Sequence, residues 1–299
     1  MTTAVRVQGL AFCCLAVTVG AAFAVFPGPD LRLEIFAAAM MIGLLGVPHG
    51  AFDIMFARTH YRIQTLKGWT WFGLSYLVLA AAVVALWLAA PGLFLISFLA
   101  VSVVHFSGDP PAGTSTVSRV IYGGAPVLLP AIWHEQEVFQ LFAMLAGDGA
   151  ASNVLPWMSL VAVPWGVALI AASIFEARTS PRTAFEMLSV GLVVTLPPPL
   201  IGFSIFFCGM HSARHILRSV AYGRALGARQ LALAGLGPTV LVFAIAAGAW
   251  WFLRTASLDA RMVQLIFVGL AAVTVPHMVV IERVRFAGWQ PLRGVKNLK

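Results

Sequence analysis

The chain has 299 residues, of which 60% are hydrophobic and only 10% are charged, and its formal net charge is +8. Soluble globular proteins carry about 25% charged residues, so this composition excludes an ordinary soluble domain. The Lys and Arg residues lie between long apolar runs, where they set membrane topology, so we expect no nucleic-acid partner. The three cysteines form no CxxC pair, which argues against a disulfide framework and against a cysteine zinc site.

Apolar runs cover most of the chain, and about 20 apolar residues suffice to cross a hydrocarbon core about 30 Å thick. We expect membrane segments near residues 8–26, 33–56, 70–90, 92–108, 118–133, 154–175, 183–197, 200–220, 236–253 and 262–281. The first of these is expected to be an uncleaved span. The sequence therefore predicts an all-α, polytopic transmembrane helical bundle of about ten membrane segments (eight to ten), in which residues 1–299 form a single domain.

Two neighbouring stretches differ from a regular span. Segment 118–133 contains two glycines and two prolines, so we expect it to be broken or re-entrant, which is tolerated only where the backbone is buried in protein. Segment 134–148 is expected to form an amphipathic interfacial helix. Its apolar face consists of Val138, Leu141, Phe142 and Leu145.

The run Pro197-Pro198-Pro199 decides the number of crossings. Three consecutive prolines cannot continue a helix, so the run is either a kink in one span or a turn between two. A turn places the basic cluster Arg214–Arg229 and the basic tail after Arg283 on the same side as most other basic loops. The excess of positive charge on cytoplasmic loops therefore favours ten crossings, with both termini in the cytoplasm and the protein in the cell inner membrane.

Five of the seven histidines lie in apolar surroundings, where polar side chains are costly and usually functional. They are His49, His105, His211, His215 and His277, whereas His60 and His134 fall in loops. His211 and His215 are four residues apart, so on a helix they share one face and can reach one metal ion. With the predicted topology, all five lie in the cytoplasmic half of four spans. Imidazoles from facing helices can build a metal site in a bundle core.

Two carboxylates repeat the same spacing. Asp53 follows His49 by four residues, and Asp109 follows His105 by four. A histidine that binds a metal usually donates its other N–H to a carboxylate, so we expect each Asp to orient its own histidine. Direct ligation by an Asp, as in a two-His-one-carboxylate iron site, stays open as the alternative. His277 is open as a fifth ligand, a substrate-positioning group or a structural hydrogen bonder.

The sequence also predicts the surroundings of two further sets of residues. Arg214, between the paired histidines, is expected to extend to the cytoplasmic surface. The aromatic cluster Phe203, Phe206 and Phe207 precedes the histidine pair. It either lines a tunnel for an apolar substrate or packs in the core.

The four histidine segments read Gly46-Val47-Pro48-His49-Gly50-Ala51-Phe52-Asp53, Ser102-Val103-Val104-His105-Phe106, His211-Ser212-Ala213-Arg214-His215 and Thr274-Val275-Pro276-His277-Met278. Together, over about residues 40–285, they resemble the Brp/Blh family of membrane-bound β-carotene 15,15′-dioxygenases. The resemblance implies an Fe(2+) centre held by His49, His105, His211 and His215. It implies cleavage of β-carotene, a lipid-soluble carotenoid, by O₂ into two molecules of retinal, and hand-over of retinal to a rhodopsin. A transporter and a haem-binding protein that use the same histidines are the alternatives.

Overall fold

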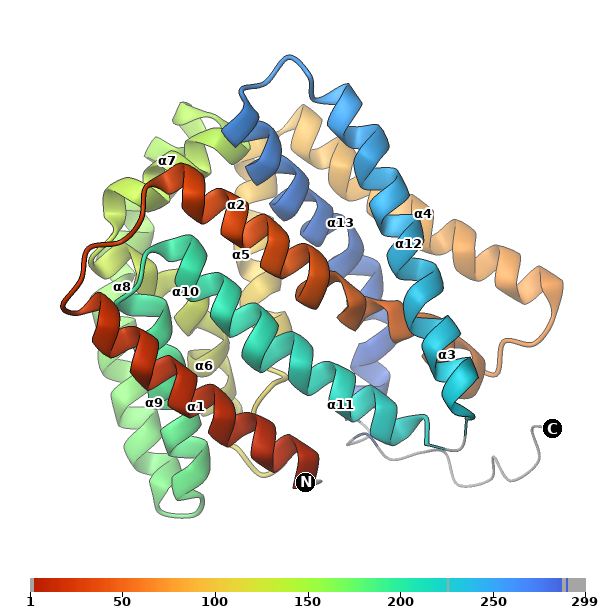
Figure 1. Cartoon of the computed structure of the whole chain (residues 1–299), viewed down its shortest axis with the longest axis horizontal. Helices are drawn as coiled ribbons and strands as arrows, with labels where there is room; N and C mark the ends of the chain where they lie inside the picture. Colours follow the sequence, from red (N-terminus) through yellow and green to blue (C-terminus); the bar gives the residue numbers. More distant parts are fainter. Residues whose placement is uncertain (1–2, 225, 287–288, 290–299) are drawn as a thin grey trace.

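The computed structural model describes residues 3–224, 226–286 and 289, and this part of the chain is helical, without a β-strand (Figure 1). The α-helices are α1 (Thr3–Phe23), α2 (Leu31–Met41), α3 (Asp53–Thr59), α4 (Leu66–Ala89), α5 (Pro91–Phe106), α6 (Thr116–Leu128), α7 (Glu135–Ala146), α8 (Asp148–Ala177), α9 (Pro181–Thr195), α10 (Pro199–Ile205), α11 (Ala213–Tyr222), α12 (Ala228–Phe252) and α13 (Leu258–Phe286). Shorter helical pieces are the π-helices Ile42–Gly46 and Phe206–Ser212 and the 3₁₀-helices Val47–Phe52 and Leu129–Ile132. The all-α prediction is confirmed.

Every predicted membrane segment is helical, and the described residues include 7 helical stretches that are long and apolar enough to cross a membrane. They are Thr3–Phe23, Leu31–Thr59, Leu66–Ala89, Asp148–Ala177, Pro199–Tyr222, Arg229–Phe252 and Leu258–Arg285. Pro91–Phe106 and Thr116–Ile132 are apolar but shorter. These lengths support a helical membrane protein. The ten crossings, the cytoplasmic termini and the single domain stay predictions.

The proline run is a turn between two packed helices. Helix α9 ends at Thr195, α10 begins at Pro199, and the two pack against each other. Gly202 permits this approach, because a Cβ atom there would lie 2.4 Å from the carbonyl oxygen of Val193. The run is therefore a turn rather than a kink, and the crossing of the membrane by each of the two helices stays a prediction.

Most of segment 118–133 is buried, including all four of its glycines and prolines. It runs as α6 through Pro126 and tightens into the 3₁₀-helix only after Leu128. A Cβ atom on Gly123 would lie 2.3 Å from the carbonyl oxygen of Val103, so this glycine lets α6 contact the backbone of α5. The break is therefore confined to the C-terminal end of the segment.

Helix α7 has the amphipathic pattern expected, but its apolar face packs on protein. Val138, Leu141 and Leu145 are buried, and α7 contacts α5, α8 and α13. The expectation that this face rests in the membrane interface is corrected, because neighbouring helices already cover it.

Two interrupted helical stretches cross the middle of the molecule (Figure 1). One runs from α2 to α3 through the segment 42–52, and the other from α10 to α11 through the segment 206–212. Their π-helical segments contact each other. Gly46 makes room for the ring of Phe207, since a Cβ atom there would lie 2.6 Å from it. Irregular helix turns of this kind are frequent at functional sites.

Candidate metal centre

Five histidine side chains from four helical stretches converge in the buried centre of the bundle. All five are buried. The distances between ring centroids are 4.5 Å for His105–His211, 5.0 Å for His215–His277, 5.1 Å for His49–His211, 5.4 Å for His49–His277, 5.5 Å for His49–His215, 5.5 Å for His105–His277 and 6.3 Å for His49–His105. The remaining histidines lie at helix ends, His60 after α3 and His134 before α7. We call these five residues the histidine cluster.

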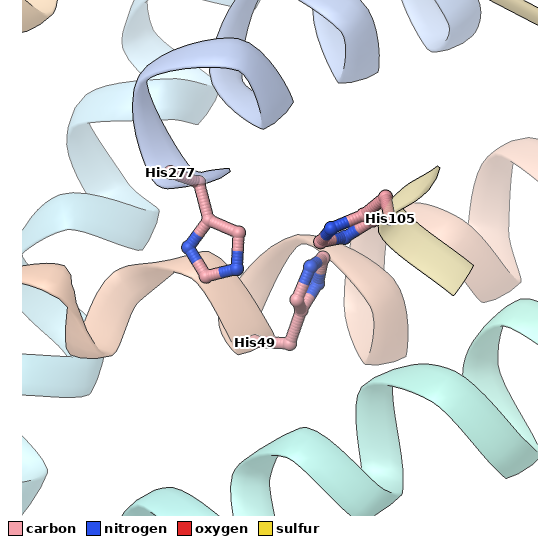
Figure 2. A group of neighbouring side chains, drawn as sticks. All are labelled: His49, His105 and His277. Atoms are coloured by element: carbon pink, nitrogen blue, oxygen red, sulfur yellow. The ribbon is translucent and has the colours of Figure 1, made fainter. Parts of the chain in front are cut away.

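Three members of the cluster bring one ring nitrogen each close to a common point. Figure 2 shows His49, His105 and His277 reaching toward one another from three separate helical segments. One ring nitrogen of each lies within 4.8 Å of those of the other two. Because a metal–nitrogen bond is about 2.0–2.1 Å long, two nitrogens on one ion lie at most about 4.2 Å apart. Side-chain adjustments of about 1 Å therefore bring the three onto one ion.

Two carboxylates each fix a histidine of the cluster from outside. His277 donates its Nδ1–H to Asp53 Oδ1 at 2.7 Å. His211 donates its Nδ1–H to the Asp109 carboxylate, with distances of 2.9 and 3.1 Å to its two oxygens. A carboxylate oxygen only accepts, so each bond leaves the lone pair of the imidazole on Nε2. This is the usual arrangement of a histidine that binds a metal through Nε2.

The pairing of carboxylates and histidines differs from the expected one. The four-residue spacing predicted Asp53 beside His49 and Asp109 beside His105, but each Asp pairs with a histidine from another helix. The spacing fails because His49 lies in a 3₁₀-helix, where residues three apart, not four, share a face. The second spacing fails because α5 ends at Phe106, before Asp109. The orienting role fits both carboxylates, but the partners are corrected.

The other three histidines complete the donor set. His49 donates its Nδ1–H to the carbonyl oxygen of Gly46 at 2.5 Å, so its Nε2 also carries a lone pair. Both ring nitrogens of His105 and Nε2 of His215 are buried without a hydrogen-bond partner among the described residues. The same holds for Nε2 of His211 and of His277.

These unpaired nitrogens test whether a metal ion fits the cluster. A buried polar atom without a partner costs about 1–3 kcal/mol, and several occur side by side here. A bound metal ion satisfies them together, because neutral imidazole nitrogens are good ligands for iron, zinc and copper. The donor chemistry and the burial therefore fit a metal ion of this class.

Arg214 is buried, contrary to the expectation that it extends to the surface. Its Nη1 lies 2.9 Å from Glu186 Oε2 of α9, and its Nε donates to Gln8 Oε1 of α1 at 3.1 Å. Of these two partners, Glu186 is buried in α9 and Gln8 is half-buried in α1. A long basic side chain stays inside a bundle only when a carboxylate pairs with it, and Glu186 supplies that carboxylate.

Tyr76 is a site residue that the sequence reasoning missed. Its hydroxyl donates to Asp53 Oδ2 at 3.1 Å, so Asp53 connects Tyr76 of α4 to His277 of α13. The signal was a hydroxyl group inside the apolar run expected near 70–90, since polar groups in lipid need a partner. Only the tertiary fold identifies that partner.

An apolar pocket lies beside the histidine cluster, with Phe106 between the two. Its lining includes Phe98 and Phe106 of α5, Leu200 and Phe203 of α10, and Phe267 of α13. The ring of Phe106 also lies 5.0 Å, centroid to centroid, from that of His211.

The aromatic residues expected at a tunnel divide into two groups. Phe203 lines the pocket, while Phe206 and Phe207 are buried in the core. Phe207 stacks on the ring of His211, with centroids 5.5 Å apart. The aromatic cluster therefore both borders an apolar space and packs against the histidines.

The fold and the site together define the class of protein: a helical membrane protein whose buried imidazoles fit a metal ion. The sequence profile of the β-carotene 15,15′-dioxygenases matches residues 40–284, which include all five histidines, and the chain belongs to this family of carotenoid-cleaving enzymes. It is 26% identical over 266 residues to the β-carotene 15,15′-dioxygenase of uncultured marine bacterium 66A03, covering 84% of this chain and 94% of that protein.

A second relative is the probable β-carotene 15,15′-dioxygenase Blh of Halobacterium salinarum. It is 25% identical over 295 residues, which is 85% of this chain and 84% of the relative. No solved structure matches the chain. The similarity to both relatives extends over most of each protein.

Proposed function

We propose that this protein is an Fe(II)-dependent dioxygenase of the cell inner membrane that splits the central 15,15′ double bond of β-carotene with O₂ into two molecules of retinal. The observation that carries the proposal is the convergence of five buried histidines in a member of this enzyme family. The hand-over of retinal to a rhodopsin stays a prediction.

The proposed ligands are His49, His105, His211 and His215, and we add His277. We include His277 because its ring nitrogen groups with those of His49 and His105 within 4.8 Å. When bound, the iron ion would supply the binding and activation of O₂, which no protein side chain provides. The histidines hold the ion through neutral imidazoles. Five imidazoles this close together exceed the one or two axial ligands that a haem takes, which favours an ion over haem.

Groups outside the ligand set fix the orientation and the tautomer of the proposed ligands. Asp109, Asp53 and the Gly46 carbonyl each accept an Nδ1–H and thereby keep the opposite nitrogen free to bind metal. The apolar pocket whose lining includes Phe106 provides a dry environment suited to a hydrocarbon. In it, the aromatic and aliphatic lining excludes water and holds the polyene beside the cluster.

Expression in a β-carotene-producing bacterium tests the proposal. The wild-type chain is expected to bleach the cells and to yield retinal, measured by chromatography of the extracts. His211→Ala and His49→Ala are each expected to reduce retinal to the background of cells without the gene, because each removes a buried ligand. His60→Ala is the matched control, since His60 lies outside the cluster at the end of α3. The control is expected to cleave at the wild-type rate.

Immunoblots of the membrane fraction verify that each variant is inserted, and metal analysis of the purified protein identifies the ion. Wild-type cleavage rates in both His211→Ala and His49→Ala would contradict the metal assignment. A wild-type protein that binds iron yet leaves β-carotene intact would contradict the substrate alone.

A further inference from the structure

A set of arginines holds the backbone that joins His105 to Asp109 and continues to Thr114. The residues after α5 form a turn, and their carbonyl groups face the guanidinium groups of neighbouring helices. Arg285 donates to the carbonyl oxygen of His105 at 3.1 Å, and Arg119 donates to those of Ser107 at 3.4 Å, Pro111 at 2.6 Å and Thr114 at 3.2 Å. Arg218 donates to the carbonyl oxygens of Gly108 at 3.1 Å and Asp109 at 2.8 Å. Arg214 donates to the carbonyl oxygen of Asp109 at 3.3 Å. We call residues 107–114 the clamped loop.

Arg218 makes the closest of the arginine contacts to Asp109. Its two terminal nitrogens donate to two consecutive carbonyls, those of Gly108 and Asp109. A planar guanidinium that binds two acceptors at once fixes their position as well as their distance. Arg218 lies in α11, the helix that also carries His215 and follows directly on His211. The same rigid element therefore holds both partners of the His211–Asp109 bond.

The Arg214–Glu186 pair supports this arrangement from the other side. Arg214 donates to the carbonyl of Asp109, and its guanidinium is held in turn by Glu186 at 2.9 Å. Asp109 lies beyond the end of α5, where its N–H donates to the carbonyl oxygen of Phe106 at 3.0 Å, and it is followed by Pro110 and Pro111, which offer no N–H.

We propose that Arg218 is a positioning residue that fixes the Asp109 carboxylate against His211 and thereby sets the metal affinity of the histidine cluster. This inference rests on the proposed metal centre. If the Asp109 carboxylate is not held in place, the ring of His211 is free to rotate. Displacements of a fraction of an ångström in the groups that support a site weaken its binding of metal. Arg218 touches neither metal nor substrate and acts through the backbone of Asp109.

A double-mutant cycle on metal affinity tests this role. Full-length protein in detergent is stripped of metal and titrated with Co²⁺ under anaerobic conditions, and its visible absorption bands report both binding and ligand geometry. Arg218→Met, which keeps the length of the side chain without its donors, is expected to weaken Co²⁺ binding about 10-fold. This lies at the lower end of the about 10–100-fold loss usual for removing a group that orients a ligand. Asp109→Ala is expected to lose at least as much.

The decisive measurement is the combined variant. If Arg218 acts through Asp109, adding Arg218→Met to Asp109→Ala lowers the affinity no further, because coupled residues are not additive. Arg218→Lys, which keeps the charge and donors but lacks the planar fork, is expected to lose less than Arg218→Met. Arg261→Met is the matched control and is expected to bind as the wild type. Arg261 also donates to loop carbonyls, those of Leu253, Arg254 and Ala256, but in the loop before α13.

Losses that multiply in the combined variant, or an Arg218→Met protein with wild-type affinity and spectrum, overturn the inference. If Arg218→Met fails to reach the membrane, the cycle is run with Arg218→Lys, and the same two outcomes decide. A wild-type protein that takes up no Co²⁺ overturns the proposed metal centre together with this inference. If the wild-type protein binds Co²⁺ and substitution of Arg218 does not change the affinity, the role of Arg218 is overturned but the proposed metal centre is not.

Discussion

Replacing Asp53 by asparagine isolates the charge of the group that orients His277. The carboxylate is buried, accepts the Nδ1–H of His277 at 2.7 Å and the hydroxyl of Tyr76 at 3.1 Å. Asparagine has the same shape, and its oxygen still accepts from His277. Its amide group still meets Tyr76, whose hydroxyl oxygen can accept. Packing is therefore retained while the charge is lost.

The size of the effect follows from the two kinds of hydrogen bond. A bond to a charged group contributes about 1.5–3 kcal/mol and a neutral one about 0.5–1.5 kcal/mol, so the charge of Asp53 contributes about 1–1.5 kcal/mol. Since about 1.4 kcal/mol corresponds to a tenfold change in an equilibrium constant, Asp53→Asn is expected to bind metal about tenfold more weakly. The carboxylate strengthens His277 as a ligand only when the imidazole is bound to a cation, so the loss appears in the bound state.

The assay is an anaerobic titration of the metal-free protein with Fe²⁺ or Co²⁺ against a competing chelator. Asp259→Asn is the matched control, because Asp259 lies at the opposite end of α13 and pairs with the exposed Arg32 at 3.4 Å. The control is expected to change the affinity less than about twofold, since exposed ion pairs contribute little. A folded Asp53→Asn protein with the wild-type dissociation constant would refute the assignment of Asp53 and His277 to the metal centre.

Two further substitutions test the support of the site. Tyr76→Phe removes one donor to Asp53 and is expected to weaken metal binding about two- to fivefold, or about 0.5–1 kcal/mol, in the same titration; an affinity equal to the wild type would show that the hydroxyl contributes nothing. Gly123→Ala places a Cβ atom 2.3 Å from the carbonyl oxygen of Val103. It is expected to cost about 1–3 kcal/mol of stability. Thermal denaturation in detergent measures it, with Gly73→Ala as control because nothing lies within 4 Å there. Equal denaturation temperatures would contradict the close contact of α5 and α6.

The sequence by itself determined the helical membrane fold and singled out the five histidines that the fold brings together. An apolar run of this kind forms an α-helix in lipid, because every backbone N–H and C=O must be hydrogen-bonded within its own segment. That constraint is local, so the positions of the helices follow from composition, and the prolines at 197–199 place a turn. The five histidines also stand out locally, since a polar side chain in an apolar run needs a compensating partner.

The tertiary structure decided which residues are the hydrogen-bond and ion-pair partners of these polar side chains. The spacing of Asp53 and Asp109 assumed a continuous α-helix, but a 3₁₀-helix at His49 and the end of α5 at Phe106 rotate both carboxylates toward other helices. Arg214 likewise depends on Glu186, a residue 28 positions away in the chain. Pairings of this kind are set by which helix faces meet, and a linear pattern of residues carries no information about that.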